Sequence, residues 1–347
     1  MCFFLVCAII LFMEENVKTF NKRNFYTSGD SARVFLFAFL LPILFALVFS
    51  YIGYAIAGAL NVTFSEGESF VTVLYENYLW FSIPYMLLSQ ITFVCIFFVY
   101  NKVNRITFSA CNLSVKKISP ITTLFCVLFG IVFVVGLYGL IEGCFGELFS
   151  MFGLSATKSP IPLDNFWWYL LNILLFGIIP AFVEELIFRG VIFSGLKRSV
   201  GRVGAIFLSA LVFALMHQNI SSFLYPFIMG VAFSLIFEYT GNLFYTMLFH
   251  LFNNITTITI QYLINNNALT LPTNINAVYI IVSIILMLVV FALFFLFYFF
   301  YLRPRKCAEQ SEEGEFNDNA IFVGKLPLLF YLGLVLSTAV VVINIFV

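Results

Sequence analysis

Charged residues are scarce in this chain: aspartate, glutamate, lysine and arginine together make up 10% of its 347 residues. Hydrophobic residues make up 62%, and the mean hydropathy is +1.05. A water-soluble core has too little volume for so much apolar surface, so these values exclude an ordinary soluble globular domain. The sequence therefore predicts an integral membrane protein whose surroundings include the lipid bilayer.

Clustered cysteines and a strong charge imbalance are also missing. The seven cysteines are scattered and form no CxxC pair, which argues against a zinc ribbon and against a disulfide framework. The formal net charge is zero, and the basic residues form short clusters beside hydrophobic runs. Such clusters are typical of membrane topology, so no nucleic-acid partner is expected.

Long apolar runs are abundant, and they set the expected fold class. A helix needs about 20 apolar residues to cross the bilayer with its backbone groups satisfied. We therefore expect an all-α fold, a polytopic transmembrane helical bundle of about eight or nine spans. The candidate spans are residues 34–60, 78–100, 118–141, 166–196, 203–216, 223–237, 243–263, 277–302 and 326–347. The runs at 203–216 and 223–237 are short, so tilted or interfacial helices are an alternative there.

Basic residues orient these spans. Clusters precede the first span and follow the second, fourth and eighth. With the N-terminus inside the cell, all these clusters fall on the cytoplasmic face, as the positive-inside rule requires. The sequence thus predicts a multi-pass protein of the cell membrane with a cytoplasmic N-terminus. Arg189 is the one basic residue inside a candidate span.

An arginine at membrane depth is expected to have a partner or a polar cavity, because an unpaired one is costly in hydrocarbon. Glu185 lies four residues before Arg189, about 40° away around an α-helix, whereas Glu184 lies about 140° away. We therefore expect Glu185 to pair with Arg189. Glu184 should point elsewhere.

The two histidines of the chain, His217 and His250, also lie in or beside apolar runs. A rise of about 1.5 Å per residue places both rings and Glu184 near the middle of the bilayer. Asn254 lies four residues after His250, on the same helical face. Each such residue alone more often only packs helices together, but the four are the groups that hydrolysis uses. A catalytic centre and an ion relay both fit this set.

Three short motifs, in order along the chain, contain these residues. They are EExxxR at Glu184, Glu185 and Arg189, FxxxH at Phe213 and His217, and HxxxN at His250 and Asn254. With these motifs and the stretch 239–243, the chain resembles the CPBP family of intramembrane metalloproteases. This family comprises type II CAAX prenyl proteases and bacteriocin-processing peptidases, and is also called the Abi family. The resemblance covers roughly residues 166–263.

The resemblance implies an intramembrane endopeptidase that cleaves a membrane-associated peptide or protein, either lipidated or carrying a leader. In the family's scheme, Glu184 is the general base that activates a water together with His217. His250 and Asn254 then donate to the oxyanion, the negatively charged oxygen of the tetrahedral intermediate. The expected supporting residues are Glu185, Arg189 and Phe213.

Two questions stay open at this point. Glu184, His217 and His250 could supply the ligands of one catalytic zinc ion, but no HExxH motif is present and a glutamate/histidine pair can activate water unaided. We favour chemistry without a metal. A non-proteolytic membrane scaffold or immunity factor and a proton-linked transporter are the alternative functions.

These inferences divide the chain into four parts. Residues 1–33 are expected to form a cytoplasmic segment, 34–165 the N-terminal transmembrane helices, 166–265 the catalytic core, and 277–347 the C-terminal transmembrane helices. Residues 1–13 are apolar but too few to span a bilayer. Met13 is an alternative translation start.

Overall fold

The structure of the chain is a computed structural model. It describes residues 22–64, 69–115, 118–140, 161–218, 220, 223–269, 277–297, 299 and 325–346. The alternative start at Met13 and the basic residues at 18, 116, 117, 158, 303, 305 and 306 lie outside these ranges.

The described residues form helices and no strand, apart from an isolated bridge between Arg23 and Ile106. The predicted all-α fold is therefore confirmed for this part of the chain. The helices are α2 (Ser28–Ala59), α3 (Phe70–Asn77), α4 (Leu79–Val103), η1 (Phe108–Cys111), α5 (Pro120–Leu140), α7 (Phe166–Asn172), η3 (Ile173–Ile178), α8 (Ile179–Glu185), η4 (Leu186–Phe193), α9 (Ser194–Leu215), α10 (Leu224–Thr240), α11 (Leu243–Asn265), α12 (Ala277–Phe297) and α14 (Leu328–Phe346).

Every apolar run predicted as a span overlaps a helix. Within the described ranges, four helical stretches are long and apolar enough to cross a membrane: Ser28–Ala59, Leu79–Val103, Pro120–Leu137 and Phe166–Leu215. Leu224–Thr240 and Leu328–Ile343 are shorter apolar helices. These lengths fit an integral membrane protein, but they do not confirm eight or nine spans.

The fourth and fifth predicted spans belong to one long helical stretch, Phe166–Leu215. The stretch is interrupted at Gly201, whose φ of 72° lies in the left-handed region that glycine adopts without a steric penalty. The chain turns back here, so that α9 packs against η4. The glycine thus divides one continuous helical stretch into two antiparallel helices.

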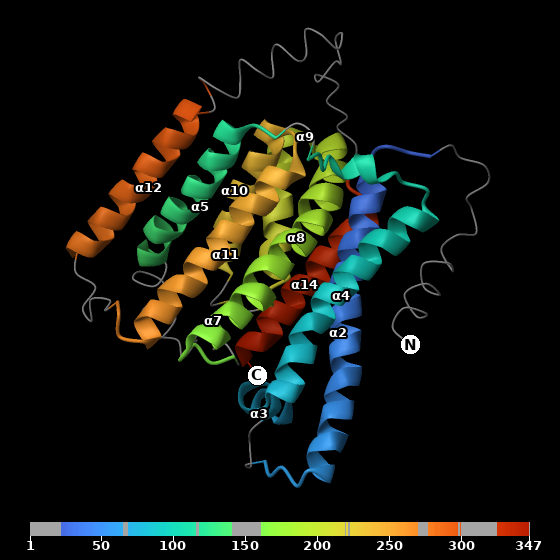
Figure 1. The fold of residues 1–347 in the computed structure, drawn as a ribbon. Coiled ribbons are helices and arrows are strands. Elements are labelled where there is room, and N and C mark those ends of the chain that lie inside the picture. Colours follow the sequence, from blue (N-terminus) through green and yellow to red (C-terminus); the bar gives the residue numbers. More distant parts are fainter. Residues whose placement is uncertain are drawn as a thin grey trace.

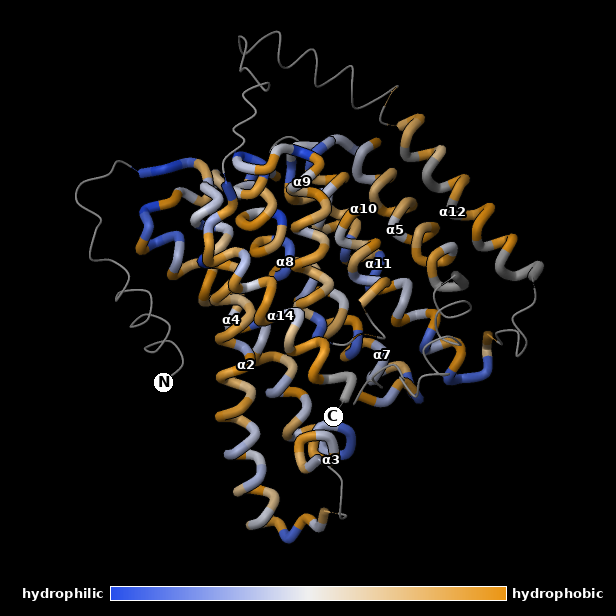
Figure 2. The backbone as a smooth tube through the Cα atoms, turned by 180° about the vertical axis from the view of Figure 1, so that it is seen from behind, coloured by the Kyte–Doolittle hydropathy of each residue, from blue (hydrophilic) through white to orange (hydrophobic). Residues whose placement is uncertain are grey.

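The helices run up and down in one bundle, with α12 beside α5 at its edge (Figure 1). Hydrophobic residues line the helices, and hydrophilic ones gather toward the helix ends (Figure 2). Basic side chains meet at one end of the bundle. There the central guanidinium carbons of Arg23 and Arg198 lie 5.9 Å and 4.5 Å from the centre of the Phe25 ring.

Two local features position the centre of the bundle. The α8 helix lies between the wider, π-helical turns of η3 and η4. Pro180 near the start of α8 has no N–H for the helix ladder, and the π turn before it accommodates this loss. Helices α9 and α10 approach closely where Gly230 of α10 lies against Ala210 of α9. A Cβ atom on Gly230 would lie only 2.8 Å from Ala210 Cα, so the approach depends on the missing side chain of glycine.

Candidate active site

A cavity of about 700 Å³ lies between the N-terminal helices α2, α3 and α4 and the helices that carry the three motifs. Four of its lining residues, here called the polar wall, are Glu184, His217, His250 and Asn254. Five lining residues from α2, α3 and α4, here called the apolar wall, are Ile43, Leu47, Tyr75, Tyr85 and Met86; α2 and α4 also contribute the polar residues Ser50, Ser89 and Gln90. The four predicted catalytic residues therefore line one common cavity, although 70 residues separate the first from the last in sequence.

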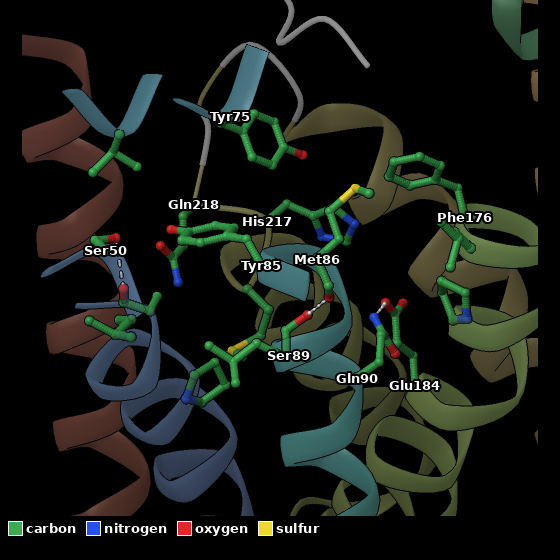
Figure 3. A pocket seen from close by; sticks show the side chains of 18 of the residues that line it. Ser50, Tyr75, Tyr85, Met86, Ser89, Gln90, Phe176, Glu184, His217 and Gln218 are labelled. Carbon is green, nitrogen blue, oxygen red and sulfur yellow. Dashed lines mark hydrogen bonds between the residues drawn. The ribbon is translucent and has the colours of Figure 1, made fainter. Parts of the chain in front are cut away.

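Glu184 is half-buried on α8 and faces the cavity. Its Oε1 accepts a hydrogen bond of 3.1 Å from Nε2 of Gln90 on α4, and Figure 3 shows the two side chains turned toward each other. No cation contacts its carboxylate among the described residues. Glu184 is thus held by a neutral amide.

Glu185, the next residue, is in a very different environment. It is completely buried, and its Oε1 accepts hydrogen bonds from Arg189 Nη1 at 2.9 Å and from His250 Nδ1 at 3.0 Å. The prediction that Arg189 pairs with Glu185, and not with Glu184, is confirmed. The ion pair also orients the His250 ring.

The Arg189 guanidinium is itself enclosed on several sides. Its Nη2 donates to the carbonyl oxygen of Gly230 at 3.0 Å. The rings of Phe213 and Phe233 lie 4.7 Å and 4.9 Å from its central carbon, where cation–π attraction is favourable. Phe213, the aromatic residue of the FxxxH motif, therefore contacts the supporting arginine. Phe233, on α10, lies in none of the three motifs.

His217 lies just after the end of α9 and is exposed to the cavity. Its Nδ1 lies 2.9 Å from the carbonyl oxygen of Phe213. A carbonyl only accepts hydrogen bonds, so Nδ1 carries the hydrogen and Nε2 keeps its lone pair in the neutral ring. This tautomer leaves Nε2 able to accept a proton.

The other polar residues lie on α11. His250 is buried and stacks on Phe233, with 4.4 Å between ring centres. Asn254 donates from Nδ2 to the carbonyl oxygen of Phe176 at 3.0 Å, and its Oδ1 accepts from Asn253 at 3.0 Å. Both ends of the Asn254 carboxamide are therefore held by hydrogen bonds. The bond to Phe176 uses only one of the two hydrogens on Nδ2.

Two contributors to the site were missed from the sequence. Gln90 lies in the predicted second span, and a glutamine inside an apolar run is a signal of the same kind as Glu184. Tyr225 donates to Asn253 Oδ1 at 2.8 Å and so supports Asn254 from α10. No pattern in the sequence indicated that tyrosine.

The geometry does not fit the zinc site considered above. Within the described part of the chain, no three His, Cys, Asp or Glu side chains are grouped so that they could hold a metal ion. Glu184, His217 and His250 share the cavity without forming such a group.

Comparison with known proteins gives one family match. Residues 166–256 match the model of a family described as type II CAAX prenyl endopeptidase Rce1-like, in agreement with the resemblance to the CPBP family. The matched segment runs from α7 into α11 and contains all three motifs. No curated protein and no solved structure matches the chain.

Proposed function

We propose that this chain, whose residues 166–256 match the Rce1-like family of CAAX prenyl endopeptidases, is an intramembrane endopeptidase. It hydrolyses a peptide bond in a membrane-associated peptide or protein. The observation that carries the proposal is that Glu184, His217, His250 and Asn254 line one cavity inside the bundle. This set combines proton acceptors with hydrogen-bond donors, as peptide hydrolysis requires.

In the proposed reaction, Glu184 is the general base. Its carboxylate takes a proton from a water molecule, and the oxygen of that water attacks the carbonyl carbon of the substrate. His217 assists through Nε2, since its Nδ1 is held by the Phe213 carbonyl. The proton on Glu184 then passes to the leaving nitrogen as the carbon–nitrogen bond breaks.

His250 and Asn254 stabilise the negative charge that develops on the substrate oxygen. Nδ1 of His250 donates to Glu185, so a second donation from Nε2 requires the protonated ring. The Glu185 carboxylate stabilises that cation. Asn254 has one amide hydrogen beyond the bond to Phe176. Donors fixed in advance around the developing negative charge favour the transition state.

The apolar wall suggests the kind of substrate. Ile43, Leu47 and Met86 present aliphatic surface, and two tyrosines add aromatic surface. Such a lining fits an apolar chain, as in a lipidated carboxyl terminus or a hydrophobic leader. We further propose that the basic end of the bundle faces the cytoplasm and that the protein resides in the cell membrane.

Cleavage of reporter peptides by the purified protein in detergent tests the function. Glu184→Gln should reduce cleavage to background while the protein keeps its fold, because the amide keeps the shape of the side chain but cannot accept the proton. Glu76→Gln is the matched control, since Glu76 is an exposed carboxylate on α3 that does not line the cavity. Full activity of Glu184→Gln would end the general-base proposal.

The same assay separates the alternatives. A transporter would respond to Glu184→Gln with altered proton coupling and would show no cleavage in the parent protein, whereas a scaffold would tolerate the change. A strong chelator should leave cleavage by the parent protein unchanged. Loss of cleavage with the chelator, restored by added zinc, would instead establish a metallopeptidase.

A further inference from the structure

We propose that Gln90 is a positioning residue for the general base. It lies on α4, outside the segment that matches the family model, and donates from Nε2 to Glu184 Oε1 at 3.1 Å. The inference rests on the proposed function, because it assigns Gln90 a part in aiming the Glu184 carboxylate at the attacking water.

The contacts of the two adjacent glutamates support this role. Glu185 is held by Arg189 and by His250. Among the described residues, Gln90 is the one side chain that hydrogen-bonds to the Glu184 carboxylate. A general base must be held in place without being neutralised by a cation, and a primary amide does this because it donates a hydrogen bond but carries no charge.

The other end of the Gln90 amide is also informative. Its Oε1 is buried and accepts no hydrogen bond from the described residues. This oxygen has almost no accessible surface, so the cavity does not reach it. Among the described residues, the amide is therefore engaged through its donor end, and the acceptor of that bond is the Glu184 carboxylate.

A simple packing role is the alternative. Polar side chains often join helices in membranes, and Gln90 connects α4 to α8. A packing role predicts a loss of stability at unchanged turnover. A positioning role predicts a loss of turnover and an altered pH dependence at unchanged stability. The two roles are therefore separable by experiment.

Two substitutions at this position provide the test. Gln90→Met keeps the length of the side chain and removes the donor, so kcat should fall about 10²-fold, the usual result of misplacing a catalytic group, while KM changes little. Thr92→Val is the matched control on the same helix, since the Thr92 hydroxyl donates to the α4 carbonyl of Leu88 and Thr92 does not line the cavity. The control should keep the kcat of the parent protein.

Gln90→Glu places a second carboxyl group against Glu184. When protonated, this group can still donate, but once both groups ionise the donor is lost and the like charges repel each other. Cleavage by Gln90→Glu should therefore decline at lower pH than cleavage by the parent protein. The other titratable or charged groups around the site, His217, His250, Glu185 and Arg189, are unchanged in this comparison.

The outcomes distinguish this inference from the proposed function. If the parent protein cleaves, Glu184→Gln does not, and Gln90→Met keeps the parent kcat, then only the role of Gln90 is wrong. A lower melting temperature of Gln90→Met with unchanged kcat would make Gln90 a packing residue. Absence of cleavage by the parent protein would remove the proposed function and this inference together.

Discussion

The two walls of the cavity are held in place by different forces. The polar wall is supported by a buried network of ion pairs and hydrogen bonds that converges on Glu185 and Arg189. The apolar wall continues into aromatic and aliphatic packing around Leu74 and Phe81. A polar network fails when one member is lost, whereas an apolar surface tolerates changes that keep its volume. Equal substitutions should therefore have unequal consequences in the two walls.

The largest effect is expected from breaking the support of the polar wall. Arg189→Met leaves the Glu185 carboxylate buried without its cation, and removing one partner of a buried ion pair costs about 3–5 kcal/mol of folding stability. Lys197→Met is the control, because Lys197 is 35% exposed and its partner Glu238 keeps Arg202 at 2.7 Å. That control should lose at most about 1 kcal/mol.

Thermal unfolding in detergent, followed by circular dichroism, measures both variants. Equal melting temperatures for Arg189→Met and Lys197→Met would contradict the network described here.

The next effect concerns chemistry without loss of fold. Asn254→Ala removes one proposed oxyanion donor and should reduce kcat by about 10² to 10³, the usual result of losing such a donor. Residual cleavage should remain, because His250 still donates. Thr256→Val is a control on the same helix, since its hydroxyl bonds the Phe252 carbonyl of α11 itself. An unchanged kcat in Asn254→Ala would remove this residue from the oxyanion site.

Part of the polar wall was accessible to sequence reasoning, and part was not. The Glu185–Arg189 pair depends on four-residue spacing within a helical stretch, which the sequence shows directly. The contact of Gln90 with Glu184 joins residues 94 positions apart, and only the packing of α4 on α8 creates it. The π-helical turns around α8 and the eight-residue α3 were also not predicted, because the prediction rested on apolar runs long enough to cross a bilayer, and such runs indicate neither a short helix nor a π turn.

A smaller effect is expected in the apolar wall. Met86→Trp adds volume to this wall, so KM for a reporter with a bulky apolar group should rise about 10-fold, while kcat changes little. Phe98→Trp is the control, because Phe98 is on the same helix but is 56% exposed on the outside of the bundle. A loss of kcat at unchanged KM would mean that the apolar wall takes part in the chemistry.

The smallest effect is expected from Tyr75→Phe, which tests whether acid–base chemistry is confined to the polar wall. Burial, with a further contribution from Tyr85, raises the pKa of Tyr75 from 10.0 to about 12. The phenol is therefore neutral across the working range, and Tyr75→Phe should leave the pH profile of cleavage unchanged between about pH 6 and 9.

Because this pKa is higher in the folded than in the unfolded state, its contribution to stability is complete below pH 10 and is lost as the pH rises toward 12. Tyr75→Phe should accordingly lose less stability than the parent protein over that alkaline range. An altered cleavage profile near neutral pH in Tyr75→Phe would show that proton transfer also depends on the apolar wall.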